Sequence, residues 1–111
     1  PIKVIIELHH LTDSEMETAA EIVAASGAAF VKTGTGWTPA AATLPRIRRI
    51  ASVVAGRAGI KASGGIRDLD TVAAMVAIGV TRFGINTASA TDLVSQVRAL
   101  PDGRLPIPAE A

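Results

Sequence analysis

Residues 59–85, GIKASGGIRDLDTVAAMVAIGVTRFGI, contain a complete strand–helix–strand pattern. The first five residues form a short apolar run around Lys61, which predicts a strand that ends at glycines. Asp68 is the expected N-cap of a helix that continues to about residue 78, where Gly79 ends it. A second short apolar run follows over residues 81–85. One helix between two such strands is typical of a right-handed βαβ crossover, so the strands are predicted to be parallel.

The same alternation extends over the rest of the chain. The strands are predicted over residues 3–7, 29–33, 59–63 and 81–85. The helices are predicted over residues 13–25, 44–55, 69–78 and 90–100. Thr12 or Asp13 is the expected N-cap of the first helix, and Thr43 that of the second, with Pro45 in its first turn. Four βα units in series predict an α/β fold with a parallel sheet.

Two architectures fit four such units. One is an open flavodoxin-like sheet, and the other is half of a TIM (β/α)8 barrel, which needs eight units and about 250 residues. In both, functional groups gather at the carboxyl ends of the strands. Residues 1–111 are expected to form one piece, and since the sequence starts at Pro1 and enters a strand at once, we expect a longer polypeptide.

Composition and charge argue against several kinds of partner and site. The net charge is +1 and aromatic residues are few, and Arg46, Arg48 and Arg49 are interpreted as the solvated face of a helix, so no nucleic-acid partner is predicted. The absence of cysteine excludes disulfides and thiolate catalysis. No apolar run approaches the ~20 residues of a membrane span and no signal peptide is recognisable, so no membrane partner and a cytoplasmic location are predicted.

Two lysines occupy equivalent positions in FVKTGTG (30–36) and GIKASGG (59–65). If the two strands are neighbours about 4.8 Å apart, alternation places Val31 and Ile60 on one face and Lys32 and Lys61 on the other. Two adjacent ammonium groups disfavour each other's charge, so one amine could be neutral near neutral pH and attack a carbonyl to form a Schiff base. Spacing does not say which one, and a single lysine at a strand end is more often merely solvated.

Glycine and hydroxyl residues follow three of the strands and suggest a phosphate site. Glycine lets backbone N–H groups approach an anion, Ser and Thr add donors, and a helix N-terminus favours negative charge. The alternative interpretation is a purely structural one, in which these glycines only make tight turns. The candidate substrate- or phosphate-binding residues are Thr33, Gly34, Ser63, Gly64, Gly65, Asn86 and Thr87.

Three further residues after the first strand carry polar side chains. His9 and His10 are adjacent in sequence and therefore diverge, and no third ligand is evident near them, so no metal site is predicted. They could instead line the mouth of a pocket. Glu7 could orient a lysine or a substrate hydroxyl, or form a structural ion pair.

The motifs FVKTGTGW, GIKASGGIRD and TRFGIN, in this order and spacing, resemble the C-terminal half of the deoxyribose-phosphate aldolase family. The resemblance implies a TIM barrel, of which this chain would provide the fifth to eighth βα units. It also implies a class I aldolase without metal or other cofactor, which joins acetaldehyde reversibly to glyceraldehyde 3-phosphate to give 2-deoxyribose 5-phosphate. Lys32 would carry the Schiff base, Lys61 would be its electrostatic neighbour and proton relay, and Gly64, Gly65 and the loop at Asn86 and Thr87 would hold the phosphate.

The resemblance also has consequences for partners. The catalytic aspartate of the family lies in the N-terminal half, so an N-terminal half-barrel in the same or another chain, or self-association, is expected to cover the open sheet edges. Two alternatives remain. One is a non-catalytic half-barrel module that binds a phosphorylated ligand or a partner subunit. The other is a Schiff-base aldolase for a non-phosphorylated aldehyde, which Asn86 and Thr87 favour because the family usually has paired serines there.

Overall fold

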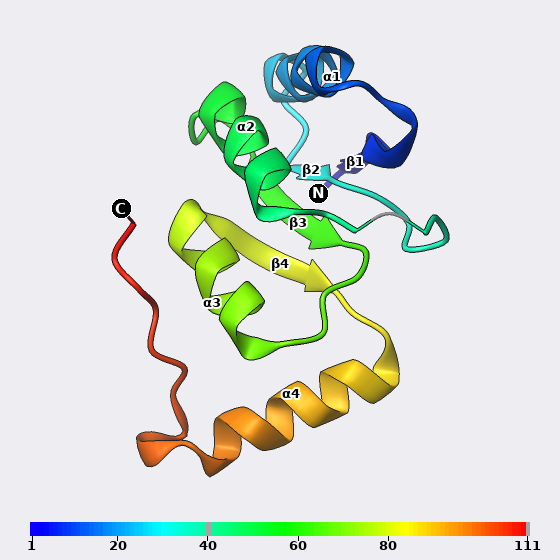
Figure 1. Cartoon of the computed structure of the whole chain (residues 1–111). Coiled ribbons are helices and arrows are strands. Elements are labelled where there is room, and N and C mark those ends of the chain that lie inside the picture. The colour runs from blue at the N-terminus through cyan, green and yellow to red at the C-terminus, as the bar shows by residue number, and fades with distance from the viewer. Residues whose placement is uncertain (40, 111) are drawn as a thin grey trace.

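The computed structural model describes residues 1–39 and 41–110, and its elements alternate between strands and helices (Figure 1). The strands are β1 Lys3–Ile5, β2 Phe30–Lys32, β3 Gly59–Ser63 and β4 Val80–Gly84. The α-helices are α1 Asp13–Ala25, α2 Leu44–Val54, α3 Leu69–Ile78 and α4 Thr87–Ala99. Two short 3-10 helices complete the set, η1 Leu8–His10 and η2 Pro101–Gly103. The prediction of four βα units is confirmed.

The sheet is parallel and its strands follow the order β1-β2-β3-β4, as expected for successive crossovers. Val31 pairs with Val4 on one side and Ile60 on the other, and Lys32 pairs with Lys61. The outer strands β1 and β4 each pair on one side only within the described residues, so each leaves an open edge.

Helices α1, α2 and α3 pack on one face of the sheet and form the core with it. The largest fully buried side chains include Met16, Ile47, Ile50 and Met75, and Val31 faces them from β2. Burying a side chain of this size contributes about 1.5–3 kcal/mol each relative to exposure. The opposite face of the sheet therefore carries the residues that alternate with Val31 and Ile60.

Capping by side chains explains where α1 and α3 begin. Thr12 and Glu15 form a capping box at α1, and the Asp68 side chain accepts a hydrogen bond from the Thr71 N–H at α3. Thr43 occupies the N-cap position of α2, but its side chain makes no capping hydrogen bond.

Two predicted boundaries were wrong by more than one residue. The first strand ends at Ile5 rather than residue 7, because Glu7 adopts a left-handed conformation (φ 45°) that no strand can continue through. The last helix begins at Thr87 rather than residue 90, because the Asn86 side chain accepts from the Ser89 N–H and so caps it three residues earlier.

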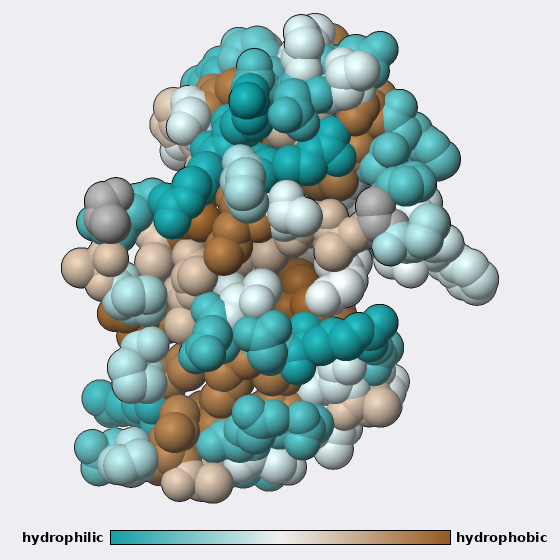
Figure 2. Space-filling view, in the orientation of Figure 1, coloured by the Kyte–Doolittle hydropathy of each residue, from teal (hydrophilic) through white to brown (hydrophobic). Residues whose placement is uncertain are grey.

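Helix α4 packs less tightly than the other helices. Leu93 is its one buried residue, and an apolar groove of about 400 Å³ lies between α3, α4 and the tail, with Val72, Val94 and Leu105 among its walls. Figure 2 shows the hydrophobic surface between these elements in the lower part of the molecule. Across residues 1–39 and 41–110, no helix is both long and apolar enough to cross a membrane.

Candidate active site

Lys32 and Lys61 are direct neighbours across β2 and β3, as their spacing predicted. Parallel strands lie about 4.8 Å apart, so the two side chains leave the same face of the sheet at close range. Arg82 pairs with Lys61 on the other side, in β4. Lys3 and Arg82 also approach the ring of Phe30, with their charged groups 5.5 Å and 5.2 Å from its centroid. The face away from the helices is therefore strongly cationic.

This clustering perturbs Lys61. Burial lowers the pKa of Lys61 below its ordinary 10.5, and the charges of Lys32, Lys3 and Arg82 lower it further. Each neighbouring cation makes a second positive charge less favourable, so Lys61 gives up its proton more readily than a free lysine. The surroundings of Lys61 therefore disfavour its charged form, as expected for one amine of a closely placed pair.

Thr33 is a structural residue rather than a wall of a binding site. Its side chain is fully buried, and its hydroxyl donates to the Ser63 carbonyl oxygen at 2.9 Å while accepting from the Ser63 N–H at 2.9 Å. Its own N–H donates to the Lys61 carbonyl. Its side chain and N–H join β2 to β3, and its carbonyl accepts from Leu8 N–H, so Thr33 serves the framework and does not line the cavity described below.

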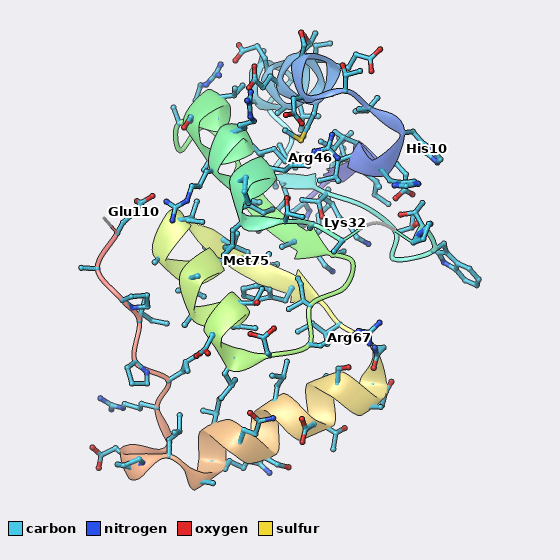
Figure 3. All side chains as sticks on the ribbon, in the orientation of Figure 1. His10, Lys32, Arg46, Arg67, Met75 and Glu110 are labelled. Atoms are coloured by element: carbon cyan, nitrogen blue, oxygen red, sulfur yellow. The ribbon has the colours of Figure 1, made fainter. Side chains whose placement is uncertain are left out.

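A cavity of about 340 Å³ opens at the carboxyl ends of the strands, where Lys32 and Arg67 lie on opposite sides in Figure 3. Its lining residues are Lys32, Thr35, Gly36, Ser63, Gly64, Gly65, Ile66, Arg67, Gly84, Ile85 and Asn86. Four predicted binding residues are thus brought together: Ser63, Gly64, Gly65 and Asn86. Gly34 and Thr87 do not line the cavity, and neither does Lys61.

The cavity contains features suited to an anion. Gly64 and Gly65 both have positive φ (113° and 69°), a conformation that glycine adopts without strain, and a side chain at Gly65 would collide with Ala41. The Ser63 hydroxyl is buried and has no hydrogen-bond partner among the residues that the structure describes. A buried hydroxyl without a partner is costly, so a bound acceptor there would stabilise it.

Arg67 is a charged residue of the cavity lining that was not among the predicted site residues. It follows GGI (64–66) by one position, just before the N-cap of α3, and its guanidinium approaches the Ser89 hydroxyl at 3.4 Å at the start of α4. The available signal was an arginine in the first residues after a glycine pair, at the amino end of a helix. Arg67 adds a fixed positive charge to the cavity beside the N-terminus of α4, which itself favours an anion.

Glu7 contacts neither lysine, contrary to one of the roles considered for it. Its carboxylate accepts from the Thr35 hydroxyl at 2.7 Å and from the Thr35 N–H at 3.0 Å. The hydrogen bond from the Thr35 hydroxyl has the largest effect and the bond from the Thr35 N–H the next largest, and both lower the pKa of Glu7 below its usual 4.5. The charges of His10 and His9 lower it further. The carboxylate is therefore anionic and committed to Thr35.

The two histidines lie in η1, where both are exposed. Their ring centroids are 5.3 Å apart and the rings are tilted by 59°. Neither residue lines the cavity. Within the part of the chain that the structure describes, no group of three His, Asp or Glu side chains could hold a metal ion.

Comparison with known proteins gives strong matches over part of their length. The chain is 62% identical over all 111 residues to the deoxyribose-phosphate aldolase of Rhizobium meliloti (strain 1021), of which it covers 45%. It thus spans about half the length of the curated relatives it matches. No protein-family model matches the chain.

Solved structures agree with this assignment. The aldolase QR15 matches with a TM-score of 0.77 and 40% identity, covering 89% of this chain and 46% of that one. A deoxyribose phosphate aldolase from Aeropyrum pernix, described as tetrameric, matches with a TM-score of 0.72 and 30% identity. The match covers 87% of this chain and 41% of that one. The four units therefore correspond to half of a TIM barrel. In sequence and in fold, the chain belongs to the deoxyribose-phosphate aldolase family and covers about half the length of its relatives.

Proposed function

We propose that the protein containing this chain is a lysine Schiff-base aldolase that joins acetaldehyde reversibly to glyceraldehyde 3-phosphate, giving 2-deoxyribose 5-phosphate. The observation that carries the proposal is the pairing of Lys32 with Lys61 beside a cavity that suits a phosphate. The choice of substrate is supported by the activity for which the relatives are named, deoxyribose-phosphate aldolase. Lys32 is assigned as the nucleophile because it lines the cavity and Lys61 does not.

The proposed reaction uses Lys32 and Lys61 as follows. The Lys32 amine attacks the acetaldehyde carbonyl and loses water to form an imine, and removal of a proton from the methyl carbon gives an enamine. The enamine carbon attacks the acceptor aldehyde, and water hydrolyses the resulting imine to release the sugar and free Lys32. We assign proton transfer during these steps to Lys61, and this assignment is supported by its lowered pKa and by its position beside Lys32.

The phosphate is assigned to the far side of the cavity from Lys32. Backbone N–H groups at Gly64 and Gly65, the Ser63 hydroxyl and the Arg67 guanidinium provide donors, and the N-terminus of α4 adds its dipole. Asn86 can donate through its backbone N–H and its side-chain NH2, since the cap of α4 uses only its side-chain oxygen.

The chain is proposed to act with further barrel strands. Both edges of its sheet are open, and the cationic inner face lacks a covering layer in the described residues. An N-terminal half-barrel, in the same or another polypeptide, or a second copy of this chain would pair with the edges and exclude water from the amines. Relatives about twice as long are consistent with the first of these arrangements.

Reductive trapping tests the chemistry directly. When the complete protein is incubated with acetaldehyde and borohydride, one reduced adduct is expected, on Lys32, because only an amine that forms an imine is trapped. The chain has three lysines, Lys3, Lys32 and Lys61, so peptide mass spectrometry distinguishes all of them. An adduct on Lys61 alone would reverse the assignment of the two lysines, and labelling of none would favour a non-catalytic binding module.

Removing Arg67 tests the phosphate assignment. Arg67→Ala is expected to raise KM for 2-deoxyribose 5-phosphate by about 10-fold or more, the effect of a lost charged hydrogen bond, and to leave cleavage of unphosphorylated 2-deoxyribose unchanged. Steady-state kinetics with both sugars would measure the change in KM. The matched control is Arg104→Ala, which removes an exposed arginine of the tail. An equal loss with both sugars would contradict the assignment. If the wild-type protein prefers the unphosphorylated sugar, a Schiff-base aldolase for a non-phosphorylated aldehyde would be favoured instead.

A further inference from the structure

We infer that Glu7 is a positioning residue that holds the loop after Lys32, residues 34–37, in the place where it forms one wall of the cavity. The inference deepens the proposed function and rests on it. Thr35 and Gly36 line the cavity together with Lys32, yet both are exposed and lie outside any helix or strand. Something must therefore fix this wall, and the contacts of Glu7 do so.

The contacts are specific to one residue of the loop. Both carboxylate oxygens of Glu7 bind Thr35, one through the backbone N–H at 3.0 Å and the other through the hydroxyl at 2.7 Å. The same hydroxyl accepts from the Trp37 N–H at 3.3 Å. Because hydrogen bonds to an ionised carboxylate are stronger than neutral ones, this pair defines both the backbone and the side-chain orientation of Thr35.

The backbone on either side of Glu7 places the carboxylate. Ile6 N–H donates to the Lys32 carbonyl at 3.0 Å, and Leu8 N–H donates to the Thr33 carbonyl at 2.9 Å. Between them Glu7 has a positive φ of 45°, which is unfavourable for a residue with a Cβ and is maintained only where the surroundings require it. The chain after β1 is thus bonded to the chain after β2 at successive points, and the Glu7 side chain extends this contact to Thr35.

The loop is shaped to receive the carboxylate. Gly34 is buried, and a Cβ added there would lie 2.8 Å from the Glu7 carboxylate oxygen. A Cβ at residue 34 would push the carboxylate out of its present position, whereas glycine leaves that position open. The glycine that the sequence suggested as part of a phosphate cradle therefore makes room for Glu7.

This arrangement separates two contributions to the reaction. Lys32 lies on β2 and is held by pairing with β1 and β3, so its position does not depend on the loop. In the proposed reaction, the wall made by Thr35 and Gly36 would contact the part of the substrate beyond the reacting carbon. Loss of Glu7 should therefore weaken binding of the sugar phosphate and leave imine formation with the small donor acetaldehyde intact.

The test uses the complete protein and three readouts. Glu7→Ala is expected to raise KM for 2-deoxyribose 5-phosphate about 10-fold or more, to change kcat less than about 3-fold, and to leave acetaldehyde trapping on Lys32 within about 3-fold of wild type. Hydrogen exchange of a peptide spanning residues 33–37 should become faster. Glu7→Gln should fall between, because one amide oxygen can still accept from Thr35 N–H, and Glu110→Gln, an exposed carboxylate near Arg48, is the control.

A KM within about 2-fold of wild type for Glu7→Ala would overturn the inference. A parallel loss of kcat and of trapping would also overturn it, because Glu7 would then act on Lys32 itself. If Glu7→Ala does not fold by circular dichroism, Thr35→Val decides, since it keeps the shape of the side chain and removes the hydroxyl; it should raise KM in the same way. Absence of trapping in the wild-type protein would instead refute the proposed function.

Discussion

Replacing Lys32 with methionine is expected to lower turnover of 2-deoxyribose 5-phosphate by roughly 10³-fold or more. Methionine has about the same length but no amine, so no imine forms and the covalent route is lost. The phosphate-binding residues lie across the cavity and are unaffected, so the dissociation constant of the sugar phosphate should change by less than about 3-fold. Initial-rate kinetics and calorimetric titration of the complete protein would measure the two quantities.

The matched control for Lys32→Met is Lys3→Met. Lys3 lies on the same face of the sheet, in β1, and its ammonium contacts the ring of Phe30. The control removes the same charge without removing the nucleophile, and its rate should fall by less than about 10-fold. Equal losses in the two variants would show that positive charge on this face, rather than an amine at position 32, supports the reaction, and would contradict the Schiff-base assignment.

Replacing Lys61 with methionine is expected to have opposite effects on activity and stability. Loss of a proton-transfer group should lower kcat by about 10²-fold or more. The variant should nevertheless melt a few degrees higher at neutral pH. The reason is that the folded protein holds the Lys61 ammonium among Lys32, Lys3 and Arg82 and partly out of water, an environment that disfavours the charge.

The pH dependence distinguishes this explanation from a general packing effect. The folded pKa of Lys61 lies below the unfolded value of about 10.5, so between the two the unfolded chain binds more protons. Stability of the wild-type protein should therefore rise with pH in this alkaline window, and the gain should be absent in Lys61→Met. The measurement is the melting temperature of both proteins from pH 7 to 10.5. A variant that is less stable at neutral pH would contradict the prediction.

Sequence alone predicted the alternation of strands and helices and the pairing of the two lysines. The alternation follows from local features such as Asp68, which caps α3, and Gly79, which ends it. The pairing of Lys32 with Lys61 follows because both occupy the same place in equivalent strands, and neighbouring parallel strands bring such places together. The glycines at 64 and 65 could likewise be assigned to the cavity, because any βα loop lies at the carboxyl edge of the sheet.

What each side chain does was decided by contacts between residues far apart in the chain. Thr33 bonds to Ser63, 30 residues away, and Glu7 to Thr35, 28 residues away, so neither partner could be read from a neighbouring position. Hydroxyl and carboxylate groups can serve equally in a binding site or in the framework, and only packing assigns them. The periodicity of the chain therefore determined the strands and the lysine pair, whereas the tertiary structure determined which polar groups remain free to meet a substrate.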